Sequence, residues 1–275
     1  MKLANLKLAT FLLLLATLFA ACFEPKEGCL DIAATNFEAG ADKDCCCEYP
    51  KLVLMVSQVY DTLLFRNDSL YPDAGGHLFR IKSVAFYLSE FQLFQGGNAF
   101  KVSDTLTLQT FVGNDTSSQL FTNDFLLVRR TPIDYAVGTF PQDGIFEEVN
   151  FRLGLSNDAQ KIVPSKAPTG HPLSAQPDSL WRGQAEGFVF LQVVVVRDSM
   201  AATLPDTLRF TEADLGQPLM GATGQFLHPT GYDFPLLLTV DYKEMFKAVN
   251  WSQHDIQAWK AQIVANLPSA FRVSQ

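Results

Sequence analysis

The chain has no cysteine after Cys47, no excess of positive charge and no catalytic motif of a common enzyme class. Lys and Arg number 21 against 29 Asp and Glu, which gives a formal net charge of −8 at pH 7. Binding to a phosphate backbone needs a broad basic face, so nucleic acid is excluded as a partner. With 48% hydrophobic and 18% charged residues, the composition also excludes wholesale disorder.

The sequence lacks the motifs that mark the common classes of enzyme. The sequence contains no glycine-rich phosphate loop, no His-Glu-x-x-His, no Gly-x-Ser-x-Gly and no Cys-x-x-Cys pair. Its four histidines never stand two or four positions apart, so neighbouring residues cannot form a metal pair. Glu147 and Glu148 are adjacent on an expected strand and would face opposite ways. We therefore expect a protein that is not an enzyme.

The N-terminus contains the pattern of a secretory signal. Lys2 and Lys7 precede an uncharged run, residues 8–21, which is shorter than the ~20 residues of a membrane-spanning helix. The run ends at Cys22 in a pattern that resembles a bacterial lipobox, with Phe19 where Leu is commonest. We expect residues 1–21 to be a lipoprotein signal peptide and Cys22 to carry the lipid anchor, facing the periplasm or the cell surface. Plain signal cleavage is the alternative.

All five cysteines lie in a short module, residues 22–50. Four of them follow the lipidation site Cys22. If Cys22 is acylated, every pairing of the remaining four joins Cys29 to Cys45, Cys46 or Cys47 and leaves two near neighbours. One bridge from Cys29 is therefore expected in an oxidising compartment. The last two thiols form either a strained bridge or a pair of soft-metal ligands.

The same module is rich in side-chain oxygens. Its sequence looks like short disulfide-closed modules found in many exported bacterial proteins. Asp31, Asn36, Asp42 and Asp44 offer oxygen ligands of the kind that calcium takes. Such residues also stabilise turns, and that interpretation is the alternative to a calcium site.

The rest of the chain, residues 51–275, has the pattern of an all-β domain. Short β-type runs bounded by turn residues predict an antiparallel β-sandwich. The runs at 78–94 and 188–196 are apolar at almost every position, which predicts central strands covered on both faces. The ten expected strands are residues 51–59, 78–94, 104–111, 125–129, 133–139, 146–153, 188–196, 207–211, 224–227 and 234–240.

One helix is expected near the C-terminus. Apolar residues recur at helical spacing after Ser252, which can cap the segment, and the helix should end before Pro268. This helix would pack on the edge or end of the sandwich. Residues 157–181 contain four prolines and little periodicity, which predicts a long loop.

Several segments, taken in order, resemble the MbnP-like copper-binding domain family of exported bacterial proteins. The similarity runs from Leu52 to Val249 and includes Phe86-Tyr87-Leu88-Ser89, Phe151-x-Leu153-Gly154, His171-Pro172-Leu173 with Trp181, and Glu186-Gly187-Phe188-x-Phe190-Leu191. The family is an all-β sandwich. The resemblance implies copper binding outside the cytoplasm through His nitrogens, with a tryptophan oxidised to kynurenine by a MauG-type di-haem peroxidase as partner.

This sequence departs from the family pattern at several positions. Ser57 and Gln58 stand where many relatives have a histidine. Residues 211–216 resemble the end of a strand that carries a histidine in the family, but here that histidine is missing. Gly183 and Gln184 replace a second aromatic residue after Trp181. His171 is the best candidate copper ligand that remains. The other candidates implied by the resemblance are His77, His228 and Trp181.

We therefore expect an exported, lipid-anchored, non-catalytic protein that binds or handles copper. Two alternatives stay open. The first is an envelope scaffold or binding lipoprotein that kept the sandwich and lost the metal. The second places a soft metal on Cys45, Cys46 and Cys47 instead of in the sandwich. For Trp181, a role as a core or rim aromatic is the alternative to a modified copper ligand.

Overall fold

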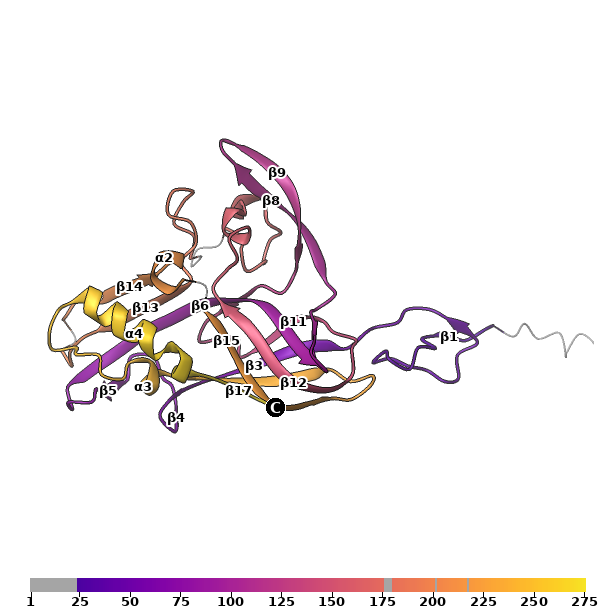
Figure 1. Ribbon diagram of the computed structural model, residues 1–275, viewed down its shortest axis with the longest axis horizontal. Coiled ribbons are helices and arrows are strands. Elements are labelled where there is room, and N and C mark those ends of the chain that lie inside the picture. Colours follow the sequence, from indigo (N-terminus) through magenta and orange to yellow (C-terminus); the bar gives the residue numbers. More distant parts are fainter. Residues whose placement is uncertain (1–23, 176–179, 201, 217) are drawn as a thin grey trace, which may run out of the picture.

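The computed structural model describes residues 24–175, 180–200, 202–216 and 218–275 (Figure 1). The expected signal peptide and the lipidation site Cys22 lie outside the described residues. Among those described, no helix is long and apolar enough to cross a membrane. The expected class is confirmed: antiparallel sheets dominate, one longer helix lies near the C-terminus, and a disulfide closes the N-terminal module.

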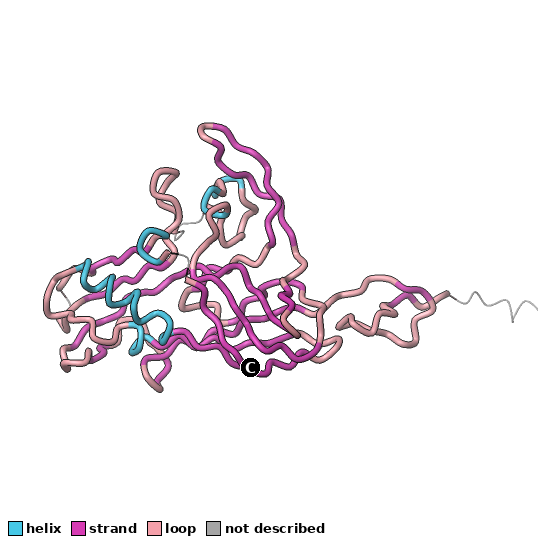
Figure 2. The backbone as a smooth tube through the Cα atoms, in the orientation of Figure 1, coloured by secondary structure: helices cyan, strands magenta, loops and turns pink. Residues whose placement is uncertain are grey.

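The sandwich consists of two sheets (Figures 1 and 2). The larger sheet has the strand order β14-β13-β6-β12-β15, with β5, β7 and β10 also paired to β6. Its members are β5 (Leu70–Pro72), β6 (Leu78–Gln95), β7 (Asn98–Phe100), β10 (Leu126–Val128), β12 (Gly144–Leu153), β13 (Leu191–Val196), β14 (Asp206–Phe210) and β15 (Leu219–His228).

The smaller sheet has the order β11-β3-β16-β17, with β4 paired to β3. Its strands are β3 (Lys51–Tyr60), β4 (Leu63–Leu64), β11 (Asp134–Thr139), β16 (Phe234–Asp241) and β17 (Phe271–Ser274). A separate hairpin, β8 (Thr105–Val112) with β9 (Asp115–Thr122), rises from the sandwich in Figure 1. The remaining elements are β1 (Glu27–Gly28), β2 (Lys43–Asp44), the 3-10 turns η1 (Ala159–Lys161) and η2 (Pro164–Lys166), and the helices α2 (Glu212–Leu215), α3 (Tyr242–Met245) and α4 (Ile256–Ala270).

Alternation of side chains explains how the two sheets face each other. Along β3, Leu52, Leu54 and Val56 are buried, and the residues between them are more exposed, as expected for a strand with one face on a core. Aromatic rings join the sheets: the Phe86 and Phe271 centroids are 5.4 Å apart. Buried apolar contact of this kind is the main force that holds a sandwich together.

All ten expected strands are present, with shifted ends. The placement of β6 and β13 in the interior of the larger sheet is also confirmed. Cover on both faces holds for residues 86–89 of β6, which are all buried, whereas β13 alternates between buried and half-buried positions. The hairpin strand β9 is not among the expected strands because its sequence contains few apolar residues.

The antiparallel prediction is wrong for one pair of strands. Strands β3 and β16 run parallel, with Phe234 opposite Leu52 and Asp241 opposite Val59. Parallel neighbours need a long crossover, and here most of the chain lies between the two strands. Strand β3 pairs antiparallel with β11 on its other side, so the smaller sheet is mixed.

Helix α4 carries the expected apolar stripe but has different ends. Trp259, Ile263 and Leu267 are buried as predicted. The N-cap is Asp255 rather than Ser252, because the Asp255 carboxylate accepts a hydrogen bond from the Ala258 N–H at 3.0 Å. The helix also continues past Pro268 to Ala270, where burial of Ala270 in the core offsets the poor helix propensity of proline.

Asp255→Ala is expected to lower the free energy of unfolding by about 1 kcal/mol, because the Ala258 N–H loses its only side-chain cap. Urea denaturation followed by circular dichroism measures the change. The matched control is Ser252→Ala, whose hydroxyl bonds only to the Asn250 side chain and should cost less than about 0.5 kcal/mol. A larger loss for Ser252→Ala than for Asp255→Ala would contradict the assignment of the cap.

Candidate metal centre

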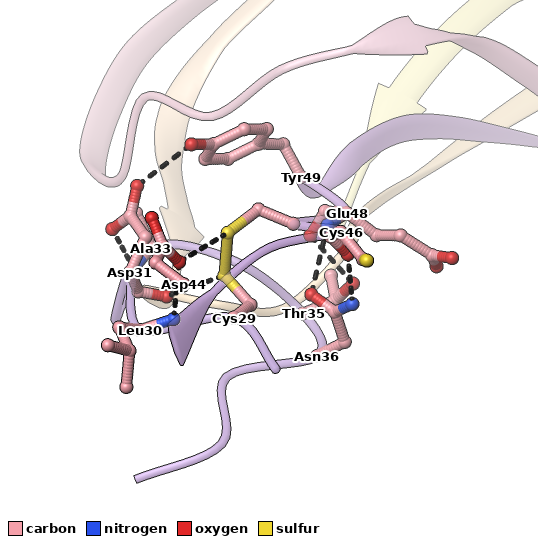
Figure 3. Close-up of a disulfide and its surroundings, with 11 residues drawn as sticks. Cys29, Leu30, Asp31, Ala33, Thr35, Asn36, Asp44, Cys46, Glu48 and Tyr49 are labelled. Carbon is pink, nitrogen blue, oxygen red and sulfur yellow. Dashed lines mark hydrogen bonds between the residues drawn. A yellow bond between two sulfur atoms is a disulfide. The ribbon is translucent and has the colours of Figure 1, made fainter. Parts of the chain in front are cut away.

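The N-terminal module is closed by one disulfide, as expected, and Cys47 is the partner of Cys29 (Figure 3). The two Cα atoms are 4.8 Å apart, and the bridge closes a sequence separation of 18. The parallel pairing of β1 with β2 aligns Glu27 with Lys43 and Gly28 with Asp44. This ladder brings the segment after β2, which holds Cys45, Cys46 and Cys47, next to Cys29.

The two thiols left over are those of Cys45 and Cys46, which are neighbours in sequence and free. Cys45 is half-buried and Cys46 is exposed. The interaction with the Cys46 side chain is the largest cause that raises the pKa of the Cys45 thiol to about 11, ahead of burial. Glu27 Oε2 lies 4.0 Å from Cys45 Sγ. The structure therefore has two free thiols at adjacent positions rather than a second bridge.

The backbone around this pair is held on both sides. Cys45 N–H donates to the carbonyl of Gly28 at 3.0 Å, and Asn36 Nδ2 donates to the carbonyl of Cys46 at 2.7 Å. Asn36 Oδ1 in turn accepts from the Glu48 N–H at 2.9 Å (Figure 3). Cys46 has a φ of 60°, a left-handed conformation that non-glycine residues seldom adopt. These bonds fix the turn that carries both thiols.

The four oxygen side chains that were candidates for calcium make hydrogen bonds within the module. Asp31 accepts from the Ala33 N–H, which is a local turn, and from the Tyr49 hydroxyl. Asp42 accepts from the Lys26 N–H, and Asp44 Oδ1 accepts from the Leu30 N–H at 2.9 Å. These two bonds and those of Asn36 join segments 10 to 16 positions apart, so the side chains hold the module together.

One group in the described part of the chain has three candidate ligand atoms within 4.8 Å of one another: Cys29, Asp44 and Cys47. Two of these atoms are the sulfurs of the disulfide. Metal ligation by cysteine requires the thiolate, so this group does not fit a metal while the bridge is closed. The free pair Cys45–Cys46 has the better donor chemistry.

His171, the best histidine candidate in the sequence, uses both of its ring nitrogens. Nδ1 accepts from the Leu173 N–H at 3.2 Å, which leaves Nε2 to donate to Asn123 Oδ1 at 3.0 Å. Burial lowers the pKa of His171, which keeps the ring neutral. A ring nitrogen that donates a proton cannot also ligate a metal, so copper binding here would break existing bonds.

His228 is 1% exposed and packs flat on Phe234, with ring centroids 4.8 Å apart. Its Nδ1 lies 2.6 Å from the carbonyl oxygen of Gln142, and its Nε2 lies 2.7 Å from that of Tyr232. Both ring nitrogens therefore face carbonyl oxygens, and metal ligation at either one would displace such a contact. The arrangement ties the end of β15 to neighbouring loops.

His77 and Trp181 lie in other surroundings. His77 Nε2 contacts the carbonyl of Arg197 at 2.6 Å, and its Nδ1 has no hydrogen-bond partner among the described residues. Trp181 is half-buried between Phe111 and Phe188, whose ring centroids are 6.1 and 4.8 Å away. These contacts match the interpretation of Trp181 as a rim aromatic. The set of His77, His171, His228 and Trp181 as a shared site stays a prediction.

In the first core strand, both ends of the Gln58 amide have hydrogen-bond partners. Gln58 Nε2 donates to the carbonyl of Arg129 at 2.6 Å, and its Oε1 accepts from the Tyr242 hydroxyl at 2.8 Å. Gln58 is therefore a structural residue of the core. Sequence reasoning missed Asn36 as the residue that clamps the thiol-bearing turn; its only signal was its place between Cys29 and the cysteine triplet.

Comparisons with known proteins give little further information. No family model matches the sequence, and no curated protein matches it. Among solved structures, the chain is similar to MbnP from Methylosinus trichosporium, with a TM-score of 0.43 and 13% sequence identity. The match covers 81% of this chain and 97% of that chain. A likeness of this size shows no family, so the MbnP-like resemblance stays a prediction.

Proposed function

We propose that this chain is an exported, lipid-anchored metal-handling protein that binds copper(I) through the thiols of Cys45 and Cys46. The observation that carries the proposal is the pair of free thiols at adjacent positions on a clamped turn. Thiolates are soft ligands and favour Cu(I) over harder ions. The signal and lipobox pattern supports a place in the cell envelope, and the absence of a catalytic motif in the sequence supports a binding role.

Binding would displace two protons. Both thiols must lose a proton to ligate one Cu(I), and the raised pKa of Cys45 keeps its proton in place at neutral pH. Lys43 is a nearby positive charge that lowers this pKa in part and would offset the negative charge of a dithiolate complex. Copper affinity is therefore expected to rise with pH.

The test is an anaerobic Cu(I) titration in competition with a chromogenic Cu(I) chelator. The protein is the mature chain with Cys22→Ser, so that no third thiol interferes. We expect about one Cu(I) per chain, tighter binding at higher pH, and loss of binding in Cys45→Ser/Cys46→Ser. The matched control is His77→Ala/His171→Ala, which should bind like the parent protein.

Three results would contradict the proposal: no Cu(I) bound by the parent protein, equal binding by Cys45→Ser/Cys46→Ser, or a loss confined to the histidine variant. A loss confined to the histidine variant would place the copper site in the sandwich instead of at the thiols. Intact mass and thiol counts of the purified protein belong to the same experiment, since a second disulfide between Cys45 and Cys46 would remove the donors.

A further inference from the structure

A large apolar cleft lies at the opposite end of the protein from the cysteine module, where β4, β5 and α3 come together (Figure 1). Its volume is about 970 Å³, at the upper end of the range for small-molecule sites. The segments that line it, residues 60–74 and 243–247, are far apart in sequence. The described chain brings them together because β3 and β16 are parallel neighbours that end side by side.

Apolar side chains line this cleft. Leu63 and Leu64 are adjacent on β4 and are 71% and 70% exposed, although large apolar residues gain free energy from burial. Tyr60 and Tyr71 stack at 4.2 Å beside them. Their hydroxyls bond to the backbone: Tyr60 donates to the Pro72 carbonyl at 2.6 Å, and Tyr71 donates to the Arg66 carbonyl at 2.9 Å. The two tyrosines therefore offer mainly ring surface.

Three carboxylates and three cations line the cleft. Asp61 pairs with Lys243 at 2.8 Å, and Glu244 pairs with Lys247 at 3.2 Å. The remaining carboxylate, Asp73, accepts from two backbone N–H groups. The Arg66 guanidinium has no ion-pair partner in the described part of the chain, and Tyr71 holds the Arg66 backbone through a second bond at 2.8 Å. Guanidinium groups recognise carboxylates with two parallel hydrogen bonds.

We propose that this cleft binds a long-chain monocarboxylate, such as a fatty acid. The acyl chain lies along Leu63, Leu64, Leu70 and the tyrosine rings, and the carboxylate pairs with Arg66. The exposed leucines favour an apolar ligand. Arg66 favours an acidic headgroup, because Asp73, the lining carboxylate with no ion pair among the described residues, is already held by two backbone N–H groups. This site is separate from the thiol pair, and the proposal does not depend on copper binding.

Calorimetric titration of the full mature chain with octanoate, decanoate and laurate, below their micelle concentrations, tests the proposal. Each added methylene should tighten the dissociation constant roughly fourfold while the cleft still has room. Laurate should bind at least tenfold more tightly than dodecanol, which has the same chain length but no charge. Tenfold is about the smallest gain in affinity expected when a hydrogen-bonded pair of opposite charges forms. Arg66→Gln should abolish that difference and leave dodecanol binding unchanged.

Substitutions of exposed leucines distinguish binding in the cleft from non-specific binding to apolar side chains elsewhere on the surface. Leu63→Asn should weaken laurate binding at least about tenfold, since a buried leucine side chain contributes more than one such factor. Leu120→Asn is the control, because Leu120 is 64% exposed on β9 and does not line the cleft. Circular dichroism confirms that each variant is folded. No laurate binding, equal binding of laurate and dodecanol, tighter binding of dodecyltrimethylammonium, or equal losses in the two leucine variants would overturn the proposal.

Discussion

Trp251→Ala is expected to lower the free energy of unfolding by about 3–5 kcal/mol, a large part of the stability of an ordinary domain. Trp251 is fully buried where α4 packs against the sandwich. Its ring centroid lies 4.9 Å from that of Phe79 and 5.0 Å from that of Trp259. Truncation would leave a cavity that the packed rings of Phe79, Trp259 and Phe246 could not close. Urea denaturation followed by far-UV circular dichroism measures the loss.

A pair of Trp→Phe variants tests the same cluster more finely. Trp251 Nε1 is buried and has no hydrogen-bond partner among the described residues, whereas Trp259 Nε1 donates to the carbonyl of Asn250 at 2.7 Å. Both changes remove the same volume, but only Trp259→Phe breaks a hydrogen bond. Trp259→Phe should therefore cost about 1 kcal/mol more than Trp251→Phe. The reverse order would show that the Trp251 N–H has an energetic role.

Asp124→Asn is expected to change how stability depends on pH. Asp124 is 2% exposed, and burial raises the pKa of its carboxyl to about 6 in the folded protein, although its bond from the Phe91 N–H at 2.8 Å works against that rise. In the unfolded chain the pKa is about 3.9. The folded state therefore holds one more proton between these values, so stability falls as pH rises through this window.

The size of this effect follows from the two pKa values. A shift of about two pKa units corresponds to about 3 kcal/mol, lost by the parent protein between about pH 4 and pH 7. Asp124→Asn cannot titrate, so the difference in unfolding free energy between parent and variant should move by this amount. Urea denaturation across this range gives that difference. The exposed Asp134→Asn is the control, and an equal pH dependence of both variants would contradict the assignment to Asp124.

Local patterns predicted the strands because alternation is a property of each segment alone. The run at β3 alternates in burial as its sequence suggests, and Trp259, Ile263 and Leu267 form the buried stripe of α4. Pairing between strands is a different matter. Nothing in the sequence of β3 distinguishes β16 as a parallel neighbour, because that choice depends on how the intervening chain folds back.

In the candidate site, too, the sequence predicted local features but not contacts between distant segments. Counting cysteines limited the disulfide to three possibilities, and only the folded module shows that Cys47 is the partner of Cys29. The sequence could not show that His171 and His228 use their ring nitrogens in hydrogen bonds with distant loops, since those partners lie 48 and 86 positions away. The apolar cleft was invisible for the same reason, because its two halves are separated by most of the chain.

The parallel pairing of β3 with β16 also bears on how the protein is made. Lys51 and Asp233, bonded at the start of this pair, are 182 positions apart. Contacts between such distant residues slow folding, because a long stretch of chain must be ordered before they form. A chain made from its N-terminus therefore has β3 without this parallel neighbour until almost the whole domain has followed. Until then, β4 and β11 are the neighbours of β3 that are present, so the smaller sheet is completed only when the last strands have been made.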